Sequence, residues 1–285
     1  MRILFLGDED RARELLGRGD DVHVETTEGL GAALRRLDEE AFDVVVVDLT
    51  AGGVTDPVPA IAGAAPKTPV VVVTDEDAEQ EGLRAIRAGA QDDFRLGEPA
   101  GPAFVRRLRY AAERKKREQL LARHALYDPL TDLANRALFR ERLAQALARA
   151  DRTGRTVAVL WLDLDGFKAA TEGWSREKTD ELIRQAGVRV HRSVRQVDTV
   201  GRPAGDEFTI LLEGLSGPAE AELVARKVAF ALREPLLKDP DVTLSASIGI
   251  AAYPGTAADE ILTGAFAALR EAKRSARGGY RLHRT

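Results

Sequence analysis

The sequence has 285 residues but no cysteine, only one methionine, and aromatic residues at just 5% of its positions. Without cysteine, disulfide bonds, thiolate metal sites and cysteine nucleophiles are excluded, which agrees with a reducing, cytoplasmic location. Neither sign of charge dominates, because 42 Lys and Arg oppose 46 Asp and Glu. No apolar run approaches the roughly 18 residues of a membrane span, and the acidic cluster at 8–10 comes too early for a signal peptide. We therefore expect a cytoplasmic protein that binds neither a nucleic-acid polymer nor a membrane.

Hydrophobic residues make up 44% of the chain and charged residues 31%, which is typical of soluble folded proteins. At roughly 150 residues per domain, the length predicts about two domains. The pattern along the chain predicts a first domain at 1–103, a basic connecting helix at 104–126 and a second domain at 127–285.

Short β-branched runs alternate with helical stretches throughout the first domain. The predicted strands are 2–7, 22–27, 42–49, 69–74 and 92–96. Some of these runs are apolar throughout, which is typical of parallel strands covered on both faces. We predict a doubly wound α/β domain with a five-stranded parallel sheet.

The connecting segment contains no glycine or proline and is predicted to form one helix. Between residues 106 and 123 it holds eight Lys and Arg against two acidic residues. The favoured interpretation is a solvated helix, which could pair with its copy in a homodimer. A nucleic-acid-binding stripe is the alternative, but the segment lacks interleaved aromatic residues.

The second domain has the order of strands and helices expected of an α+β fold. Its predicted strands lie at 156–165, in a hairpin within 199–214, and at 242–253. Its predicted helices lie at 136–150, 176–194, 219–233 and 259–277. We expect a mixed or antiparallel central sheet flanked by helices.

Acidic residues gather at two places in the second domain that can converge in the fold. Asp163 and Asp165 end its first predicted strand. Asp206 and Glu207 directly follow Gly205 at the predicted hairpin tip. A carboxylate cluster is costly unless a cation neutralises it, and oxygen ligands select Mg²⁺ or a similar hard ion. A glycine beside such a cluster lets a phosphate approach the backbone closely.

Five sequence blocks of the second domain occur in the order and at the spacing of one protein family. They are DPLTDLANRALF (128–139), LDLDGFK (162–168), VRQVDTVGRPAGDEF (194–208), SASIGIAAYP (245–254) and ALREAKRSAR (268–277). With these blocks the second domain resembles the GGDEF family, the diguanylate cyclase domain of bacterial cyclic di-GMP signalling. The first domain resembles, more weakly, the receiver domain of response regulators.

The resemblance implies a reaction and a set of site residues. The family joins two GTP molecules into cyclic di-GMP within a homodimer, and each 3′-hydroxyl attacks the α-phosphate of the other GTP to release pyrophosphate. Carried over by position, Asp163, Asp206 and the carbonyl of Leu164 would hold Mg²⁺. Glu207 would lie beside them as an acidic partner or base. The phosphates would be held by three cations, Lys168, Lys273 and Arg277.

A second implied site lies just before the signature. Arg195 and Asp198 match the RxxD motif of the family's allosteric cyclic di-GMP site. Arginine can grip the O6/N7 edge of guanine, and a carboxylate can accept from the base's N–H groups. The alternative is an ordinary surface ion pair, but the spacing to the signature favours the ligand site.

Several positions depart from the family pattern, mainly where guanine is bound. Ala204 replaces the first glycine of the signature, which costs on the order of 1–2 kcal/mol if a left-handed backbone is needed there. Thr171 stands where the family has a guanine-binding Asn, and only Asp180 survives from the turn that follows. Threonine offers one hydroxyl where asparagine offers a donor and an acceptor, so guanine recognition should weaken.

The receiver resemblance is also incomplete. Asp48 matches the phosphorylated aspartate, while Gly7 and Leu96 stand where an acidic residue and a lysine are usual. Asp8 and Glu9 match the acidic residues that bind Mg²⁺ in receiver domains, and Thr74 matches the residue that carries the switch hydroxyl. Two interpretations follow: a domain phosphorylated by a histidine kinase, or a receiver-shaped dimerisation module.

Three hypotheses on function remain. In the first, the second domain has lost most of its cyclase activity and is a receptor that binds cyclic di-GMP through the RxxD site. In the second, it is a working, Mg²⁺-dependent cyclase inhibited by its product at that site. In the third, it is a scaffold that dimerises without binding nucleotide. The altered guanine positions favour the first.

Overall fold

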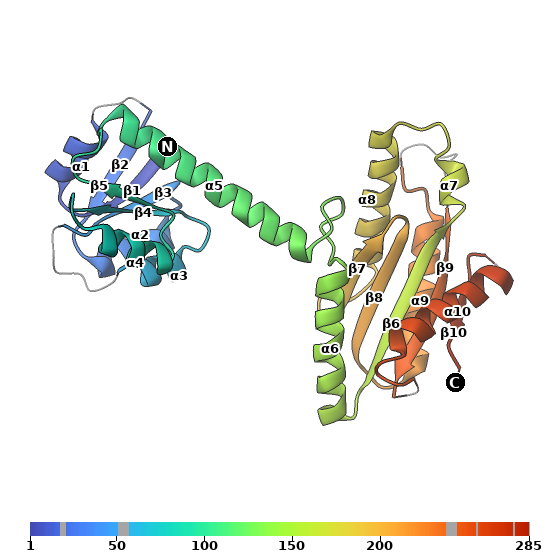
Figure 1. Cartoon of the computed structure of the whole chain (residues 1–285). Coiled ribbons are helices and arrows are strands. Elements are labelled where there is room, and N and C mark those ends of the chain that lie inside the picture. Colours follow the sequence, from blue (N-terminus) through green and yellow to red (C-terminus); the bar gives the residue numbers. More distant parts are fainter. Residues whose placement is uncertain (18–20, 51–56, 238–243, 255, 276, 285) are drawn as a thin grey trace. The chain divides into compact units, whose positions relative to one another are not determined.

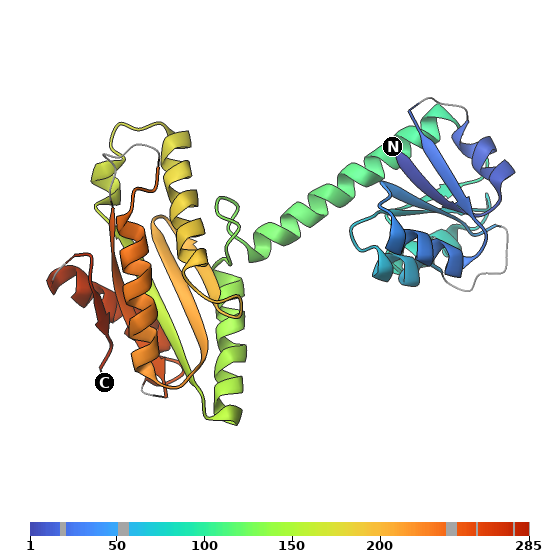
Figure 2. The same cartoon turned by 180° about the vertical axis from the view of Figure 1, so that it is seen from behind.

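The computed structural model describes residues 1–285 except 18–20, 51–56, 238–243, 255, 276 and 285. The chain folds into two compact units, Met1–Ala122 and Arg123–Thr285, which Figures 1 and 2 show from opposite sides. Within the described residues, none of the helices combines the length and hydropathy needed to cross a membrane.

The first unit is built on a five-stranded parallel sheet with the order β2-β1-β3-β4-β5. Its strands are β1 (Arg2–Leu6), β2 (His23–Thr27), β3 (Val44–Asp48), β4 (Val70–Thr74) and β5 (Asp92–Arg95). Its helices are α1 (Glu9–Leu16), α2 (Leu30–Glu39), α3 (Pro57–Ala64), α4 (Glu79–Arg87) and the first part of α5 (Pro102–Leu126). The parallel sheet and its five predicted strands are confirmed, each to within two residues at either end.

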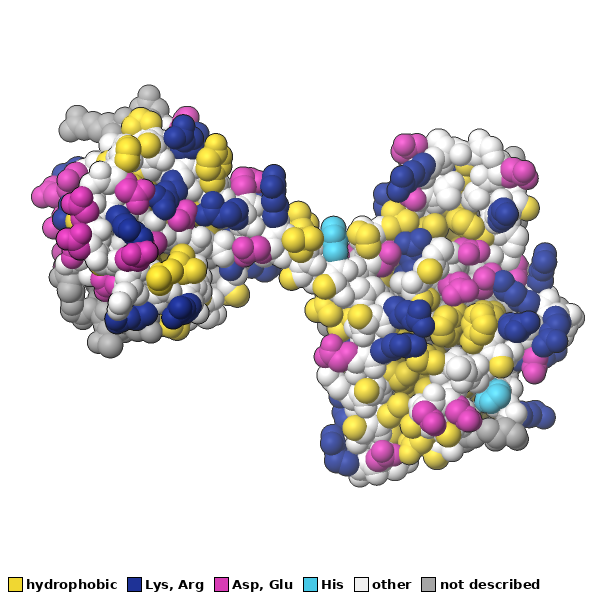
Figure 3. All heavy atoms as spheres, viewed as in Figure 1, with side chains coloured by type: hydrophobic (Ala, Val, Ile, Leu, Met, Phe, Trp, Pro, Cys, Tyr) yellow, Lys and Arg dark blue, Asp and Glu magenta, His cyan; other side chains and the backbone are white. Residues whose placement is uncertain are grey.

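Burial of the valine-rich strands follows from helices on both faces of this sheet. Alternate residues of β3 belong to two separate hydrophobic clusters, one on each face. Such strands lose their apolar surface to water on both sides, which is why their sequences do not alternate with polar residues. Charged side chains of both signs are interspersed on the face of this unit that Figure 3 shows.

Helix α5 is a single helix, as its sequence predicts. Phe104, Leu108 and Ala111 are buried in the core of the first unit. Further along the helix, the side chains of Leu120 and Leu121 are 54% and 69% exposed. The helix therefore leaves apolar residues uncovered in its second half.

The second unit is built on a mixed sheet with the order β10-β9-β6-β8-β7. Its strands are β6 (Thr156–Asp165), β7 (Thr199–Ala204), β8 (Glu207–Leu215), β9 (Ser245–Tyr253) and β10 (Tyr280–Leu282), and all neighbours are antiparallel except β9 and β10. Its helices are α6 (Arg136–Thr153), α7 (Phe167–Ala170), α8 (Arg176–Arg192), α9 (Pro218–Arg233) and α10 (Ile261–Ser275). The mixed sheet is as expected, and the start of the predicted strand 242–253 lies outside the described residues.

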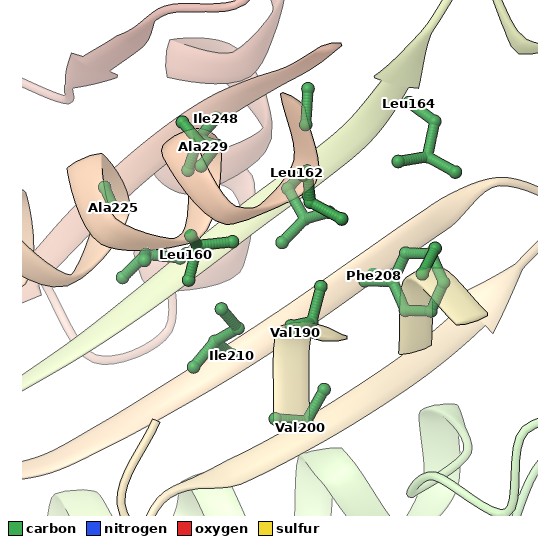
Figure 4. Close-up of a cluster of buried hydrophobic side chains, with 14 of the residues drawn as sticks. Leu160, Leu162, Leu164, Val190, Val200, Phe208, Ile210, Ala225, Ala229 and Ile248 are labelled. Atoms are coloured by element: carbon green, nitrogen blue, oxygen red, sulfur yellow. The ribbon is translucent and has the colours of Figure 1, made fainter. Parts of the chain in front are cut away.

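The two faces of this sheet carry different structures. On one face, Leu160, Leu162 and Leu164 of β6 pack with residues of α8 and α9 in the core that Figure 4 shows. On the other face, α6 and α10 cover a smaller cluster that includes Phe139 and Ala265. Because side chains alternate along a strand, Asp163 and Asp165 of β6 lie on the same side as Val157, Val159 and Trp161, which face α6 and α10. This alternation positions the candidate site.

Candidate functional site

The end of β6 carries two carboxylates with different surroundings. Asp163 lies opposite Glu207 in the β6–β8 register. The Asp165 carboxylate accepts three hydrogen bonds, each 2.8 Å long, from the hydroxyls of Ser245 and Ser247 and the backbone N–H of Gly278. Asp165 thus ties β6 to β9 and to the segment after α10, whereas Asp163 lines a cavity and pairs with Lys273.

The signature residues form a tight hairpin between β7 and β8. β7 ends at Ala204 and β8 begins at Glu207, so Gly205 and Asp206 make the turn. Gly205 has φ +55°, a left-handed value that favours glycine. Among non-glycine residues in the described part of the chain, only Asp132 has a positive φ. Ala204 therefore lies in an ordinary strand conformation, and the cost considered for it at this position does not arise.

Seven of the predicted site residues line one cavity of ≈ 680 Å³. The backbone N–H of Leu164 donates to the carbonyl of Asp206 at 3.3 Å, which holds the hairpin tip beside the end of β6. The seven predicted residues that line the cavity are Asp163, Leu164, Lys168, Thr171, Asp206, Lys273 and Arg277. Two carboxylates, three cations and the residue Leu164 thus line one solvent-accessible space.

The charge balance of this cavity centres on Asp163. Burial raises the pKa of Asp163, and the neighbouring Asp206 and Asp165 charges act in the same direction. Lys273 opposes them, because its Nζ lies 2.6 Å from Asp163 Oδ1. The carboxylate is therefore poorly stabilised by the protein alone, and additional positive charge would favour its ionised form.

The oxygen ligands in the cavity fit a hard divalent cation that completes its coordination with other oxygen ligands. No group of three or more His, Cys, Asp or Glu that could hold a metal is found among the described residues. Mg²⁺ commonly uses one or two carboxylates together with substrate phosphates and water. Asp163, Asp206 and the Leu164 carbonyl supply such a partial set, and Lys168 and Arg277 line the same space.

Comparison with known proteins now identifies the second unit. A family model described as "Diguanylate cyclase, GGDEF domain" matches residues 125–279, more than half of the chain. The chain belongs to the GGDEF family. Both the mixed sheet and the hairpin that carries the signature agree with this assignment.

Individual relatives cover different shares of the chain. MucR of Pseudomonas aeruginosa, a bifunctional diguanylate cyclase/cyclic di-GMP phosphodiesterase, is 42% identical over 159 residues, which are 55% of this chain and 23% of MucR. The diguanylate cyclase TpbB of the same species is 34% identical over 203 residues, 70% of this chain and 47% of TpbB. This chain therefore spans less than half the length of either relative.

Solved structures of GGDEF domains are similar in fold to the second unit. The GGDEF domain of TpbB is 37% identical, with a TM-score of 0.53, over 55% of this chain and 94% of that chain. The GGDEF domain of DgcB from Caulobacter crescentus, solved in complex with c-di-GMP, is 26% identical, with a TM-score of 0.52, over 56% of this chain and 96% of that chain.

Gly205, Glu207 and Asp180 were predicted for the same site but do not line this cavity. Glu207 lines a neighbouring groove, where its Oε2 accepts a hydrogen bond from Trp161 Nε1 at 3.2 Å. Asp180 lies on α8, with its Oδ2 3.8 Å from Nε of Arg176. The structure thus separates Asp206 and Glu207, although they are adjacent in the sequence.

Thr171 lines the cavity but uses its hydroxyl within the protein. Its Oγ1 donates to the carbonyl of Phe167 at 2.9 Å, at the end of α7. A base in the cavity would therefore meet an oxygen acceptor whose single proton is already engaged. This geometry agrees with the weaker guanine recognition that the sequence predicts.

The RxxD residues share one turn before β7. Asp198 is 7% exposed, and its carboxylate accepts from the backbone N–H groups of Arg195 at 2.9 Å and of Glu213 at 3.4 Å. The side chain of Arg195 is exposed. Asp198 therefore has a clear structural role, and Arg195 is the more accessible member of the pair.

Sequence reasoning missed Arg202, which braces the signature hairpin. Its guanidinium donates to the carbonyl of Gly205 at 2.7 and 2.9 Å and to Asp128 Oδ1 at 2.8 Å. Asp128 also accepts from the backbone N–H and hydroxyl of Thr131. Burial alone raises the pKa of Asp128, but the bonds from Thr131 and Arg202 outweigh it and lower the pKa. An arginine two residues before the signature was the available sequence signal.

The first unit places its predicted residues in two separate networks. Asp48 has a side chain only 2% exposed, with Nε of Arg11 3.7 Å from one oxygen and the Thr50 hydroxyl 2.7 Å from the other. Thr74 is fully buried and donates to Asp93 Oδ1 at 2.7 Å. Neither Arg11 nor Asp93 was expected from the sequence.

Two further predicted residues of this unit have local roles. Asp8 is the N-cap of α1, where its carboxylate accepts from the backbone N–H groups of Asp10 and Arg11. Glu9 pairs with Arg13 one helical turn further on, at 2.5 Å. Both arrangements stabilise the start of a helix irrespective of any bound ion.

Proposed function

We propose that the GGDEF domain is a Mg²⁺-dependent diguanylate cyclase that converts two GTP into cyclic di-GMP and two pyrophosphates. The observation that carries the proposal is the convergence of Asp163 and Asp206 with Lys168, Lys273 and Arg277 on one cavity. Two carboxylates and three cations match the needs of a metal-bound triphosphate. The diguanylate cyclases among the relatives support the same activity.

In the proposed reaction each protomer of a homodimer holds one GTP. The 3′-hydroxyl of each GTP forms a bond to the α-phosphorus of the other, as the bond from that phosphorus to pyrophosphate breaks, so that two bonds form and two pyrophosphates leave. Mg²⁺ bound with the nucleotide would offset charge on the phosphates. The cations of the cavity orient the triphosphate, and Glu207, opposite Asp163, is the candidate acceptor for the hydroxyl proton.

The guanine end of the site is expected to bind weakly. The Thr171 hydroxyl already donates to the carbonyl of Phe167, and the carboxylate of Asp180 lies 3.8 Å from the guanidinium of Arg176. The phosphates then supply most of the binding energy. We therefore expect a working enzyme with a high KM for GTP.

The test is turnover by the purified chain after bound nucleotide has been stripped. Incubation with GTP and Mg²⁺, followed by chromatography, should yield cyclic di-GMP and pyrophosphate. Asp206→Ala should abolish both products, whereas Glu222→Ala, an acidic residue of α9 outside the cavity, should leave the rate unchanged. No product from folded protein at millimolar GTP would reject the proposal.

A cyclic di-GMP receptor is the second candidate, and the altered guanine position at Thr171 favours it. Under this alternative the exposed Arg195 grips the ligand, and calorimetry shows binding without turnover. Arg195→Ala should remove binding, while Arg192→Ala, a nearby exposed arginine, should not. Asp198 is a poor choice for this test, because its carboxylate holds the turn itself. If the protein neither converts GTP nor binds a nucleotide, the result favours the scaffold hypothesis.

For the first unit we propose a receiver-like dimerisation module. The strand order of its sheet supports a receiver-like fold. Leu96 in place of lysine, and the engagement of Thr74 by Asp93, support a role that does not depend on a phosphorylated Asp48. Acetyl phosphate should then leave the dimerisation constant unchanged, whereas a phosphate-dependent change would favour control by a histidine kinase.

A further inference from the structure

A groove opens on the second unit between α6 and α10, on the sheet face opposite the core of Figure 4. Its volume is ≈ 480 Å³, within the size range of small-molecule sites. Among the described residues, none lines both this groove and the cavity that contains Asp163 and Asp206. The groove is therefore a separate feature of the domain.

The floor of the groove is aromatic. Trp161 of β6 and Phe266 of α10 meet edge to face, with ring centroids 5.3 Å apart. Phe139 of α6 also lines the groove. Phe266 is 41% exposed, so a large apolar ring faces water at this point. A second planar ring placed against these two would remove apolar surface from water and add a favourable ring contact.

The rim of the groove is basic. Arg136 and Arg140 of α6 and Arg270 of α10 line it, and Figure 3 shows basic side chains beside hydrophobic ones on this face. Within the part of the chain that the structure describes, no carboxylate forms an ion pair with any of the three. Further along α6, by contrast, Arg149 pairs with Glu213 at 2.6 Å. Three guanidinium groups without acidic partners give the rim a charge complementary to an anion.

The groove also touches the signature hairpin. Trp161 Nε1 donates to Glu207 Oε2, and both residues line the groove. Ala204, the residue in place of the first signature glycine, lines it as well. A molecule in the groove would therefore contact the tryptophan that holds the signature glutamate.

We propose that this groove binds a planar aromatic anion of about mononucleotide size. Its ring lies on Trp161 and Phe266, and its phosphate, sulfonate or carboxylate pairs with the arginines of the rim. Charge complementarity and the aromatic floor argue for a single compact ligand that combines both features. Binding at this site does not require turnover, although the groove includes Glu207, the proton acceptor in the proposed cyclase reaction.

Binding can be measured through Trp161, because the chain has only two tryptophans. In full-length protein carrying Trp174→Phe, titration with 8-anilinonaphthalene-1-sulfonate should quench Trp161 emission saturably by energy transfer. Arg140→Ser with Arg270→Ser should raise the Kd about tenfold, as expected for lost charge-assisted hydrogen bonds. Arg226→Ser with Arg281→Ser, two exposed arginines outside the groove, should change the Kd less than about twofold.

Two further measurements make the test specific. Phe266→Ala should also weaken dye binding, and circular dichroism melting of every variant checks that each remains folded. Adenosine 5′-monophosphate should displace the dye, whereas adenosine, which lacks the anion, should not. The proposal is overturned by folded protein without saturable quenching, by equal Kd values in the rim and control pairs, or by adenosine competing as well as its phosphate.

Discussion

Thr171 is the residue of the cavity lining at which guanine recognition can be tested by a single substitution. Its hydroxyl is already donated to Phe167, so replacement by asparagine adds a free donor and an acceptor at the cavity wall. We expect Thr171→Asn to lower the KM for GTP about tenfold, the equivalent of one or two good hydrogen bonds. Pyrophosphate release at varied GTP measures this directly.

The matched control at this position is Thr171→Val. It removes a hydroxyl that does not serve the base, so its KM should stay within about twofold of the parent value. If valine raises the KM strongly, or asparagine fails to lower it, then guanine does not approach this wall of the cavity.

Arg202 and Asp128 form a partly buried ion pair whose contribution to stability should depend on pH. The folded-state pKa of Asp128 lies below its ordinary value, so the stabilisation is complete above the unfolded pKa of about 3.9 and is lost as pH falls through the folded value. Arg202→Gln should cost about 2 kcal/mol at pH 7. The difference from the parent should shrink below about pH 4.

Urea unfolding followed by tryptophan fluorescence can check this, because Trp161 and Trp174 both lie in the second unit. Arg192→Gln, an exposed arginine of α8, serves as the control and should cost little at any pH. A loss for Arg202→Gln that stays constant down to pH 3 would show that Asp128 is not the group involved.

How far single residues can be predicted depends on what fixes their position. Asp163, Asp206 and Lys273 were expected in one site and line one cavity, because a strand end, a hairpin tip and a helix end leave little freedom. The separation of Glu207 from Asp206 was not expected. It follows from the hairpin, because Asp206 lies in the turn and lines the cavity, whereas Glu207 begins β8 and accepts a hydrogen bond from Trp161. Arg11 beside Asp48 depends on tertiary packing and had no sequence signal.

The backbone conformation of the signature hairpin predicts how substitutions at Gly205 and Ala204 change stability and kcat. Gly205 holds a left-handed backbone at the turn, and Ala204 holds an extended one in β7. Gly205→Ala should therefore destabilise the second unit by about 1–2 kcal/mol. Ala204→Gly, which restores the family signature, should bring no gain in kcat and a loss of at most about 1 kcal/mol.

Urea unfolding and turnover of the two variants separate these expectations. The pair is internally matched, because each variant exchanges glycine and alanine at adjacent positions. A clear rise in kcat for Ala204→Gly would mean that the first signature position limits catalysis by some route other than backbone strain.

Elements with strong periodic signals were predicted well. β6 lies at 156–165 as expected, because ten residues alternate between a buried core face and a partly polar face. The short elements α3, α7 and β10 were missed. α3 contains two prolines and no charged residue, α7 has only four residues, and β10 has three and exists through pairing with β9. Tertiary contacts stabilise such segments more than their own sequences do.

The chain as a whole combines a parallel α/β unit with a GGDEF domain through one long helix. A cyclase of the proposed kind needs two protomers, because each holds one GTP and attacks the other. Leu120 and Leu121 on α5 are exposed apolar residues that a second copy could cover. Dimerisation through α5 would then link the first unit to the activity of the second.

This arrangement predicts a rate that depends on protein concentration. Below the dimer dissociation constant, the rate per protomer should fall in proportion to concentration. Leu120→Gln with Leu121→Gln should weaken the dimer about tenfold or more, since two apolar side chains lose their cover. Arg117→Gln, on the same helix, should have little effect. Sedimentation equilibrium and pyrophosphate release should move together; a rate per protomer that stays constant while the double variant becomes monomeric would show that catalysis does not require this dimer.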